Sequence, residues 1–237
     1  MVAGVVVVLG LSACAGPEDG GRRPEVAVSV SLPADPKAAL EFGAGKLGTQ
    51  SARVSFTLGS GGWPRETFGS GVVDATGTNY EITGESFVVR RIGDEVWLKL
   101  LKRPEGTPAD QWFFHEKDLN KWMRRSVFNM DTSTTFSEGF PWKLPRRAVK
   151  NGSDFVRTGE RAFKGATATD SEKITHFSAE LDQAGRITRL GVGTAEPFDN
   201  LYEYTFSDFG TSVELQPPPA AEVIDVEYVD PLSTGFW

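Results

Sequence analysis

Residues Ser51 to Glu116 read SARVSFTLGSGGWPRETFGSGVVDATGTNYEITGESFVVRRIGDEVWLKLLKRPEGTPADQWFFHE, and this stretch decides the fold. Apolar and polar residues alternate in six short segments separated by turn residues, and a period of two is typical of β-strands with one apolar face. The apolar positions of the six segments are Val54, Phe56 and Leu58; Val72 and Val73; Tyr80 and Ile82; Phe87 and Val89; Val96, Leu98 and Leu100; and Trp112 and Phe114. We expect a meander of antiparallel strands whose apolar face must be covered, either by the rest of the chain or by a ligand.

The remaining sequence predicts more strands and one clear helix, about twelve strands in all. Asp35 and Pro36 are a typical helix start and Gly48 a typical stop, so a short helix precedes the meander. The further strands are expected at Asp154–Arg161, Gly165–Glu172, Thr175–Leu181, Arg186–Val192, Leu201–Ser207, Thr211–Leu215 and, at an edge, Val223–Val229. With no second linker after Ala34, the pattern predicts a mainly β protein built on a single strongly curved antiparallel sheet.

Composition excludes several classes of function. The chain of 237 residues has a net charge of -7, so it lacks the basic footprint of a nucleic-acid-binding protein. Its single cysteine excludes a disulfide within the chain. The only two histidines, His115 and His176, lie in strand patterns and are interpreted as rim residues, and neither metal-ligand spacing nor a nucleophile motif occurs. We therefore expect no enzyme activity, no metal and no cofactor.

The single cysteine follows a short apolar run at the N-terminus. Leu11-Ser12-Ala13-Cys14 matches a lipobox, in which small residues precede a cysteine that receives a diacylglyceryl thioether. The other interpretation is a free cysteine near a disordered end. The lipobox predicts a lipid anchor on Cys14 that holds the protein on the extracytoplasmic side of the cell membrane. The expected organisation is a signal peptide over 1–13, a linker over 14–34, one domain over 35–230 and a loose tail over 231–237.

The segment 118–147 departs from the strand pattern. Asp118 can cap a helix, and Leu119, Trp122, Met123 and Val127 recur at helical spacing after it, which predicts a helix followed by a weakly structured, aromatic-rich insert. Six large apolar residues are expected to line or cover a hydrophobic pocket: Trp122, Met123, Phe128, Phe136, Phe140 and Trp142.

The same region is basic. Between Lys117 and Lys150 eight basic residues and three acidic ones give a net charge of +5. This excess fits either a solvated helix face or contact with anionic lipid head groups. The residues expected to contact head groups are Arg124, Arg125, Arg146 and Arg147.

Several stretches resemble the actinobacterial LppX/LprG-type lipoproteins, which share a fold with LolA-like periplasmic carriers. They are Leu11–Cys14, the helix-then-strand from Ala39-Leu40 to Ser51–Leu58, Arg91–Lys99, Gln111-Trp112-Phe113, Ala179–Leu190 and Tyr204–Gly210. The resemblance implies a half-barrel with helices across its concave face, and several members of the group bind acylated lipids there.

Two functions remain open on the sequence. The first is a membrane-anchored lipoprotein that binds or carries a lipid or other hydrophobic ligand in a cavity. The second is an anchored interaction or envelope-sensing module whose concave face is filled by its own helices. Unfilled volume behind the aromatic insert distinguishes the two.

Overall fold

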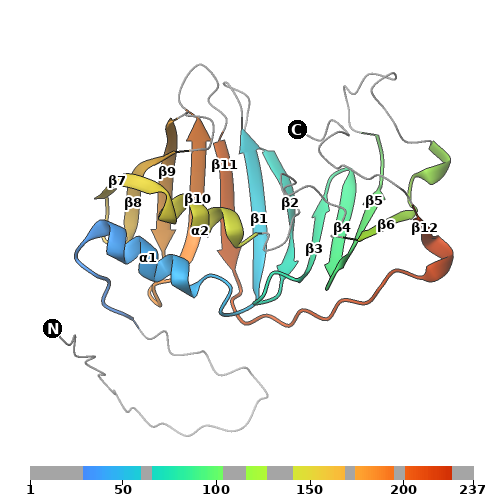
Figure 1. Cartoon of the computed structure of the whole chain (residues 1–237), viewed down its shortest axis with the longest axis horizontal. Helices are drawn as coiled ribbons and strands as arrows, with labels where there is room; N and C mark the ends of the chain where they lie inside the picture. Colours follow the sequence, from blue (N-terminus) through green and yellow to red (C-terminus); the bar gives the residue numbers. More distant parts are fainter. Residues whose placement is uncertain are drawn as a thin grey trace, which may run out of the picture.

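The described part of the chain folds as one large open sheet with its two α-helices on one side (Figure 1). The computed structural model describes residues 29–59, 66–103, 116–126, 141–168, 174–194 and 201–225. Twelve strands in these ranges pair in the order β12-β6-β5-β4-β3-β2-β1-β11-β10-β9-β8-β7. All neighbouring pairs are antiparallel except β12 with β6, which is parallel. The mainly β fold class is confirmed, with this parallel pair as the one departure.

The sheet consists of two meanders, β1 to β6 and β7 to β11, joined where β11 pairs with β1. The strands are β1 (Ala52–Gly59), β2 (Glu66–Val73), β3 (Asn79–Gly84), β4 (Phe87–Ile92), β5 (Glu95–Leu100), β6 (Trp122–Ser126), β7 (Gly152–Arg157), β8 (Ala162–Ala168), β9 (Ile174–Leu181), β10 (Ile187–Thr194), β11 (Leu201–Ser207) and β12 (Val223–Asp225). The predicted segment with Trp112 and Phe114 lies outside the described residues.

Helix α1 (Pro36–Lys46) begins and ends as the sequence predicts. The Asp35 side chain accepts a hydrogen bond of 2.7 Å from the backbone N–H of Ala38, and Pro36 occupies the first turn. The chain leaves the helix through Gly48, whose φ of 69° is a left-handed conformation that favours glycine. The buried side of α1 carries Ala39 and Leu40, which join the core.

Helix α2 (Lys143–Lys150) is an element that the sequence pattern does not predict separately. Pro145 lies in its first turn, where proline is tolerated because that backbone N–H has no partner within the helix. Ala148 and Val149 are buried against the core, whereas Lys143, Arg146, Arg147 and Lys150 are exposed. This short helix therefore forms by packing one apolar side, not by strong capping signals.

The helix predicted from Asp118 is wrong. A single turn of 3-10 helix covers Glu116–Asp118, and strand β6 begins at Trp122. Asn120 has a φ of 62°, a left-handed conformation that a continuing right-handed helix excludes, and its N–H donates to the carbonyl of Leu100 at 2.8 Å. Pairing with β5 then extends the chain, so the period is two and not 3.6.

The predicted strand at 211–215 is also wrong. Both sides of β11 are already paired, with β1 and with β10, so the segment after Gly210 finds no partner there. It runs instead along the sheet to β12 (Figure 1). On the way, Arg90 of β4 donates to the carbonyl of Gln216 at 2.7 Å, and Lys99 of β5 lies 3.7 Å from Glu222. The edge strand predicted from Val223 is observed as β12.

Candidate functional site

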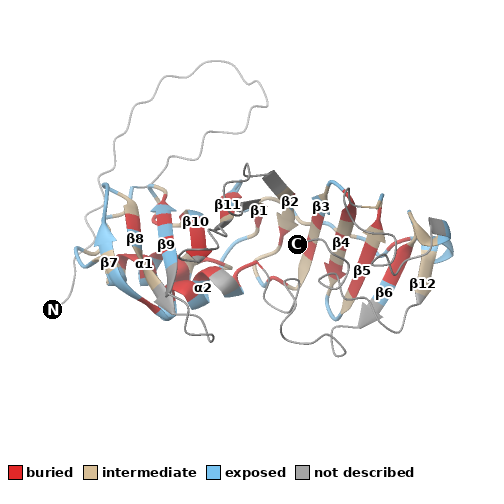
Figure 2. Cartoon of the chain, turned by 90° about the horizontal axis from the view of Figure 1, so that it is seen from above, coloured by how far each residue is buried: buried red, intermediate tan, exposed pale blue. Residues whose placement is uncertain are grey.

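One continuous apolar row crosses the sheet on the side where α1 and α2 lie, which we call the helix face. The backbone register aligns it from β11 to β6, and each of its large side chains belongs to the core. The row consists of Phe206, Val54, Gly71, Ile82, Val89, Leu98 and Met123. Figure 2 shows the buried bands on both halves of the sheet and both helices over the half that contains β7 to β11.

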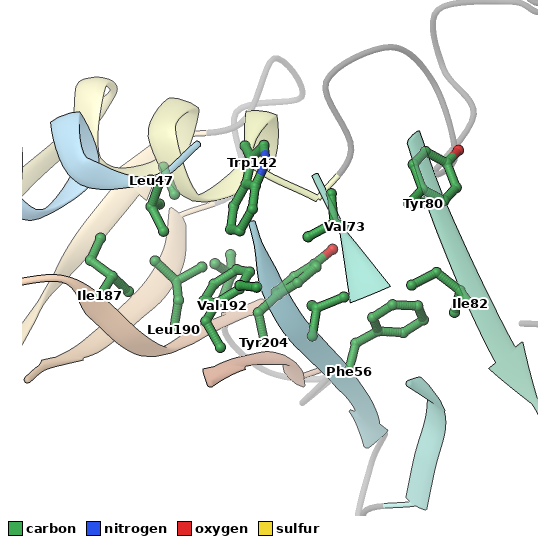
Figure 3. Close-up of a cluster of buried hydrophobic side chains, with 14 of the residues drawn as sticks. Leu47, Phe56, Val73, Tyr80, Ile82, Trp142, Ile187, Leu190, Val192 and Tyr204 are labelled. Carbon is green, nitrogen blue, oxygen red and sulfur yellow. The ribbon is translucent and has the colours of Figure 1, made fainter. Parts of the chain in front are cut away.

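The helices fill the helix face over β7 to β11. Trp142, which directly precedes α2, exposes 1% of its surface and packs on Phe206 with ring centroids 5.1 Å apart. Its indole N–H donates to the carbonyl of Asp74 at 3.1 Å. In Figure 3 the Trp142 side chain lies below α2, between Leu47 and Val73 and above Tyr204. This half is therefore packed by the chain itself.

The helix face over β2 to β6 carries no described helix (Figure 1), yet its core side chains are as buried as those of the other half. Ile82, Val89 and Leu98 expose 2% or less. This half is the candidate ligand site, because the continuous apolar row extends into it beyond the two described helices, with its side chains buried in this structure.

The structure separates two neighbouring residues of the predicted pocket. Met123 lies on the helix face, paired with Leu98. Trp122 lies on the opposite, outer face, with its ring 4.8 Å from the Arg90 guanidinium and 5.5 Å from the Lys99 ammonium. Adjacent residues of a strand point to opposite faces, so these two cannot line one pocket.

One charged residue interrupts the apolar helix face. Arg91 pairs with Tyr80 on β3 and with Val96 on β5, and it exposes only 2% of its surface. Its Nε donates to the carbonyl of Gly93 at 2.9 Å, whereas its Nη1 has no hydrogen-bond partner among the described residues. Burial raises the pKa of the Tyr80 phenol well above its ordinary value, and the charge of Arg91 and a hydrogen bond from it act in the opposite direction.

Sequence reasoning did not single out Arg91 as a site residue, although a signal is present. Phe87, Val89 and Arg91 share one strand parity, which places an arginine at an apolar position. Burying an arginine at such a position lowers the stability of the fold unless its charge and its N–H donors find partners.

The four predicted head-group arginines do not form one cluster. Arg124 lies on the outer face of β6, 3.6 Å from Glu95, and Arg146 donates from α2 to the carbonyl of Leu47. Arg147 is exposed on α2. The backbone of Arg125 pairs with Val96, and its side chain lies outside the described part.

Several predicted residues are outside the described ranges. They are Cys14, Phe128, Phe136, Phe140 and His115, and their roles stay predictions. His176 is described and exposed, which agrees with a rim residue.

A polar hollow of about 230 Å³ lies over β8 to β11. Arg189 donates there to Glu203 at 2.7 Å and lies 3.2 Å from Glu180, and the hydrogen bond and charge of Glu203 raise the pKa of the Arg189 guanidinium. Its other lining residues are Thr158, Ala162, Phe163, Lys164, Ser178 and Ala179. The charges compensate one another, so this hollow is a weak candidate site.

Two kinds of site are not found in the described ranges. No group of three or more His, Cys, Asp or Glu side chains is placed there to hold a metal ion. Within the same residues, no helix is both long and apolar enough to cross a membrane.

Comparison with known proteins gives likenesses of fold alone. No protein-family model matches this chain, and no curated protein matches its sequence. The chain is similar to the crystal structure of the Mycobacterium tuberculosis lipoprotein LppX. The identity is 13% and the TM-score 0.48, and the alignment covers 75% of this chain and 97% of LppX. A LolA superfamily protein from Nitrosomonas europaea matches at 8% identity and a TM-score of 0.35, over 80% of this chain and 97% of that one.

Proposed function

We propose that this chain is a lipoprotein, anchored through Cys14 on the extracytoplasmic side of the membrane, that binds a hydrophobic ligand on the helix face of β2 to β6. The observation that supports the proposal most is the apolar row. It continues through Ile82, Val89, Leu98 and Met123, beyond the part of the sheet on which α1 and α2 lie. A surface of this kind recognises a ligand by its hydrocarbon and not by reactive groups.

The other half of the sheet is a poor place for a ligand. Over that half, Leu40 of α1, Trp142 before α2 and Val149 of α2 already occupy the apolar face, and Trp142 packs on Phe206. The core cluster also includes Ile82, Val89 and Leu98 of the other half, but no described helix lies over them. Protein cores are packed as densely as organic crystals, so a ligand enters only where side chains give way. The proposed site is therefore limited to β2–β6, with Met123 at its edge. The proposed roles of Phe128, Phe136 and Phe140 in lining it remain predictions.

A matched pair of variants tests the location of the site. Leu98 and Leu190 are both buried on the helix face, at 2% and 0% exposure, but on different halves of the sheet. Each Leu→Phe change overpacks the core and costs about 1–3 kcal/mol of stability. We expect Leu98→Phe to weaken binding of the neutral fluorescent probe N-phenyl-1-naphthylamine at least about fivefold, or about 1 kcal/mol. Leu190→Phe should leave the affinity unchanged. Equal effects of the two changes on affinity would contradict the assigned site.

The anchor is tested separately. The variant Cys14→Ser removes the only thiol. We expect the parent chain to resist extraction from membranes by alkaline carbonate and the variant to appear in the soluble fraction, because two or more acyl chains are needed for stable anchoring. Retention of the serine variant in the membrane would refute lipidation at Cys14.

A second candidate function is an anchored interaction module with no ligand. The burial of Ile82, Val89 and Leu98 favours it, since side chains that expose 2% or less are already covered in this state. In that case the probe does not bind to the parent chain at all. The probe measurement therefore separates the two functions.

A further inference from the structure

We infer that Arg91 binds the anionic head group, a carboxylate or a phosphate, of an amphiphilic ligand whose hydrocarbon lies on the apolar row. This inference rests on the proposed function and specifies the chemistry of its ligand. It starts from the place of Arg91 within the helix face, between Tyr80 and Val96, both of which belong to the core.

The described residues compensate the charge of Arg91 poorly. A guanidinium stays protonated in proteins and carries five N–H donors. For Arg91, the described residues provide the Gly93 carbonyl and the Tyr80 hydroxyl as partners, and no described carboxylate forms an ion pair with it. Its Nη1 is left without a partner in that part of the chain. A buried donor without a partner is rare in folded proteins and needs an explanation.

Two other arginines of the described sheet differ from Arg91 in having carboxylate partners. Arg90, one residue earlier, points to the outer face, where it pairs with Glu81 and donates to the Gln216 carbonyl. Arg189 on β10 is held by Glu180 and Glu203. Both of these arginines have carboxylate partners from the protein, whereas Arg91 is two positions from Val89 of the apolar row and has none among the described residues.

The chemistry selects the class of ligand. A carboxylate or phosphate oxygen supplies the negative charge and the acceptors that Nη1 lacks, and guanidinium binds both groups well. The hydrocarbon of the same molecule would run from Arg91 along Val89, Ile82 and Leu98. A neutral lipid of the same length can satisfy only the apolar part of this site.

Competition binding tests the inference on the full chain carrying Cys14→Ser. N-phenyl-1-naphthylamine is the probe, and the competitors are two matched pairs: oleic acid against oleyl alcohol, and oleoyl lysophosphatidic acid against monooleoylglycerol. A charge-assisted hydrogen bond predicts that at least one acid displaces the probe at a concentration about tenfold to a hundredfold lower than its neutral partner. Preference in only one pair identifies the head group as carboxylate or phosphate.

Two variants assign the preference to Arg91. Arg91→Gln should reduce the acid-to-neutral ratio to about one. The control Arg53→Gln removes an exposed arginine that pairs with Asp208 on the surface, and should keep the parent ratio. If Arg91→Gln does not fold, the ratio measured on the parent chain still decides the question.

Three outcomes overturn the inference, and they differ in what they say of the proposed function. If the parent chain binds the acids and their neutral partners equally, Arg91 does not select the head group, but the hydrophobic site stands. If Arg91→Gln keeps the parent chain's preference for acids, Arg91 does not bind the head group, and the hydrophobic site again stands. If neither the parent nor Arg53→Gln binds the probe or any competitor, the proposed function fails and the inference fails with it.

Discussion

Replacing Trp142 tests whether the helix half of the sheet is filled by the protein itself. Trp142 exposes 1% of its surface, packs on Phe206 in a tilted arrangement with ring centroids 5.1 Å apart, and donates through its indole N–H to the Asp74 carbonyl at 3.1 Å. We expect Trp142→Ala to lower the free energy of unfolding by about 3–5 kcal/mol, because it leaves a cavity under α2. The orphaned carbonyl adds little, since the Gly77 N–H also donates to it at 3.3 Å.

Urea unfolding followed by far-ultraviolet circular dichroism measures this loss without relying on tryptophan fluorescence. Trp142→Phe is the matched control. It keeps a ring over Phe206 but loses the indole N–H, so it should cost about 1 kcal/mol through the hydrogen bond, plus a smaller packing loss. If Trp142→Ala costs less than about 1 kcal/mol and instead weakens probe binding, Trp142 lines a ligand site and the division of the sheet is refuted.

Three further predictions concern backbone space, ionisation and capping. Gly71→Ala should lower the free energy of unfolding by about 2–4 kcal/mol, because the new Cβ would lie 1.7 Å from the Glu81 carbonyl oxygen. Gly45→Ala, on the open surface of α1, should instead raise it by about 0.5–1 kcal/mol. Similar urea midpoints for the two variants would contradict this prediction. Burial raises the pKa of Tyr80 above its ordinary value of 10.0, so its contribution to stability is fully present below pH 10.0 and is lost as the pH rises from there through the raised pKa of the folded state. Tyr80→Phe should flatten this alkaline loss in unfolding curves, and an unchanged loss would refute the prediction. Asp35→Ala should cost about 1 kcal/mol in thermal or urea unfolding by removing the 2.7 Å cap of α1, and Asp35→Asn should restore most of it; equal stabilities of all three proteins would show that the cap does not matter.

The strands are the part of the fold that the sequence predicts best. Val54, Ile82, Val89 and Leu98 alternate with polar residues, and this local pattern alone is enough to assign the face of each strand. Two failures have a common physical cause. The helix predicted around Trp122 does not form because this segment pairs with β5 as a strand. The strand predicted at 211–215 does not form because β11 has no free edge left for it to pair with. Both depend on partners distant in the sequence, which a local period does not encode.

The candidate site could be predicted only in part. Met123 and Trp142 are buried on the helix face or against it, as large apolar residues should be, but Trp142 belongs to the filled half. The parity of strand β4 is enough to place Arg91 on the apolar face. Whether its donors find partners depends on three-dimensional packing, so the sequence could not have shown that Nη1 lacks one in the described part of the chain.

Native mass spectrometry tests the central claim most directly, namely that the helix face of β2 to β6 binds a hydrophobic ligand. The Cys14→Ser chain is purified without detergent from a lipid-rich bacterial host and sprayed under gentle conditions. The account predicts a population heavier than the polypeptide by the mass of a lipid, and a smaller population in the Leu98→Phe variant but not in Leu190→Phe. A single species at the mass of the bare polypeptide, unchanged after incubation with oleic acid or monooleoylglycerol, would contradict the account.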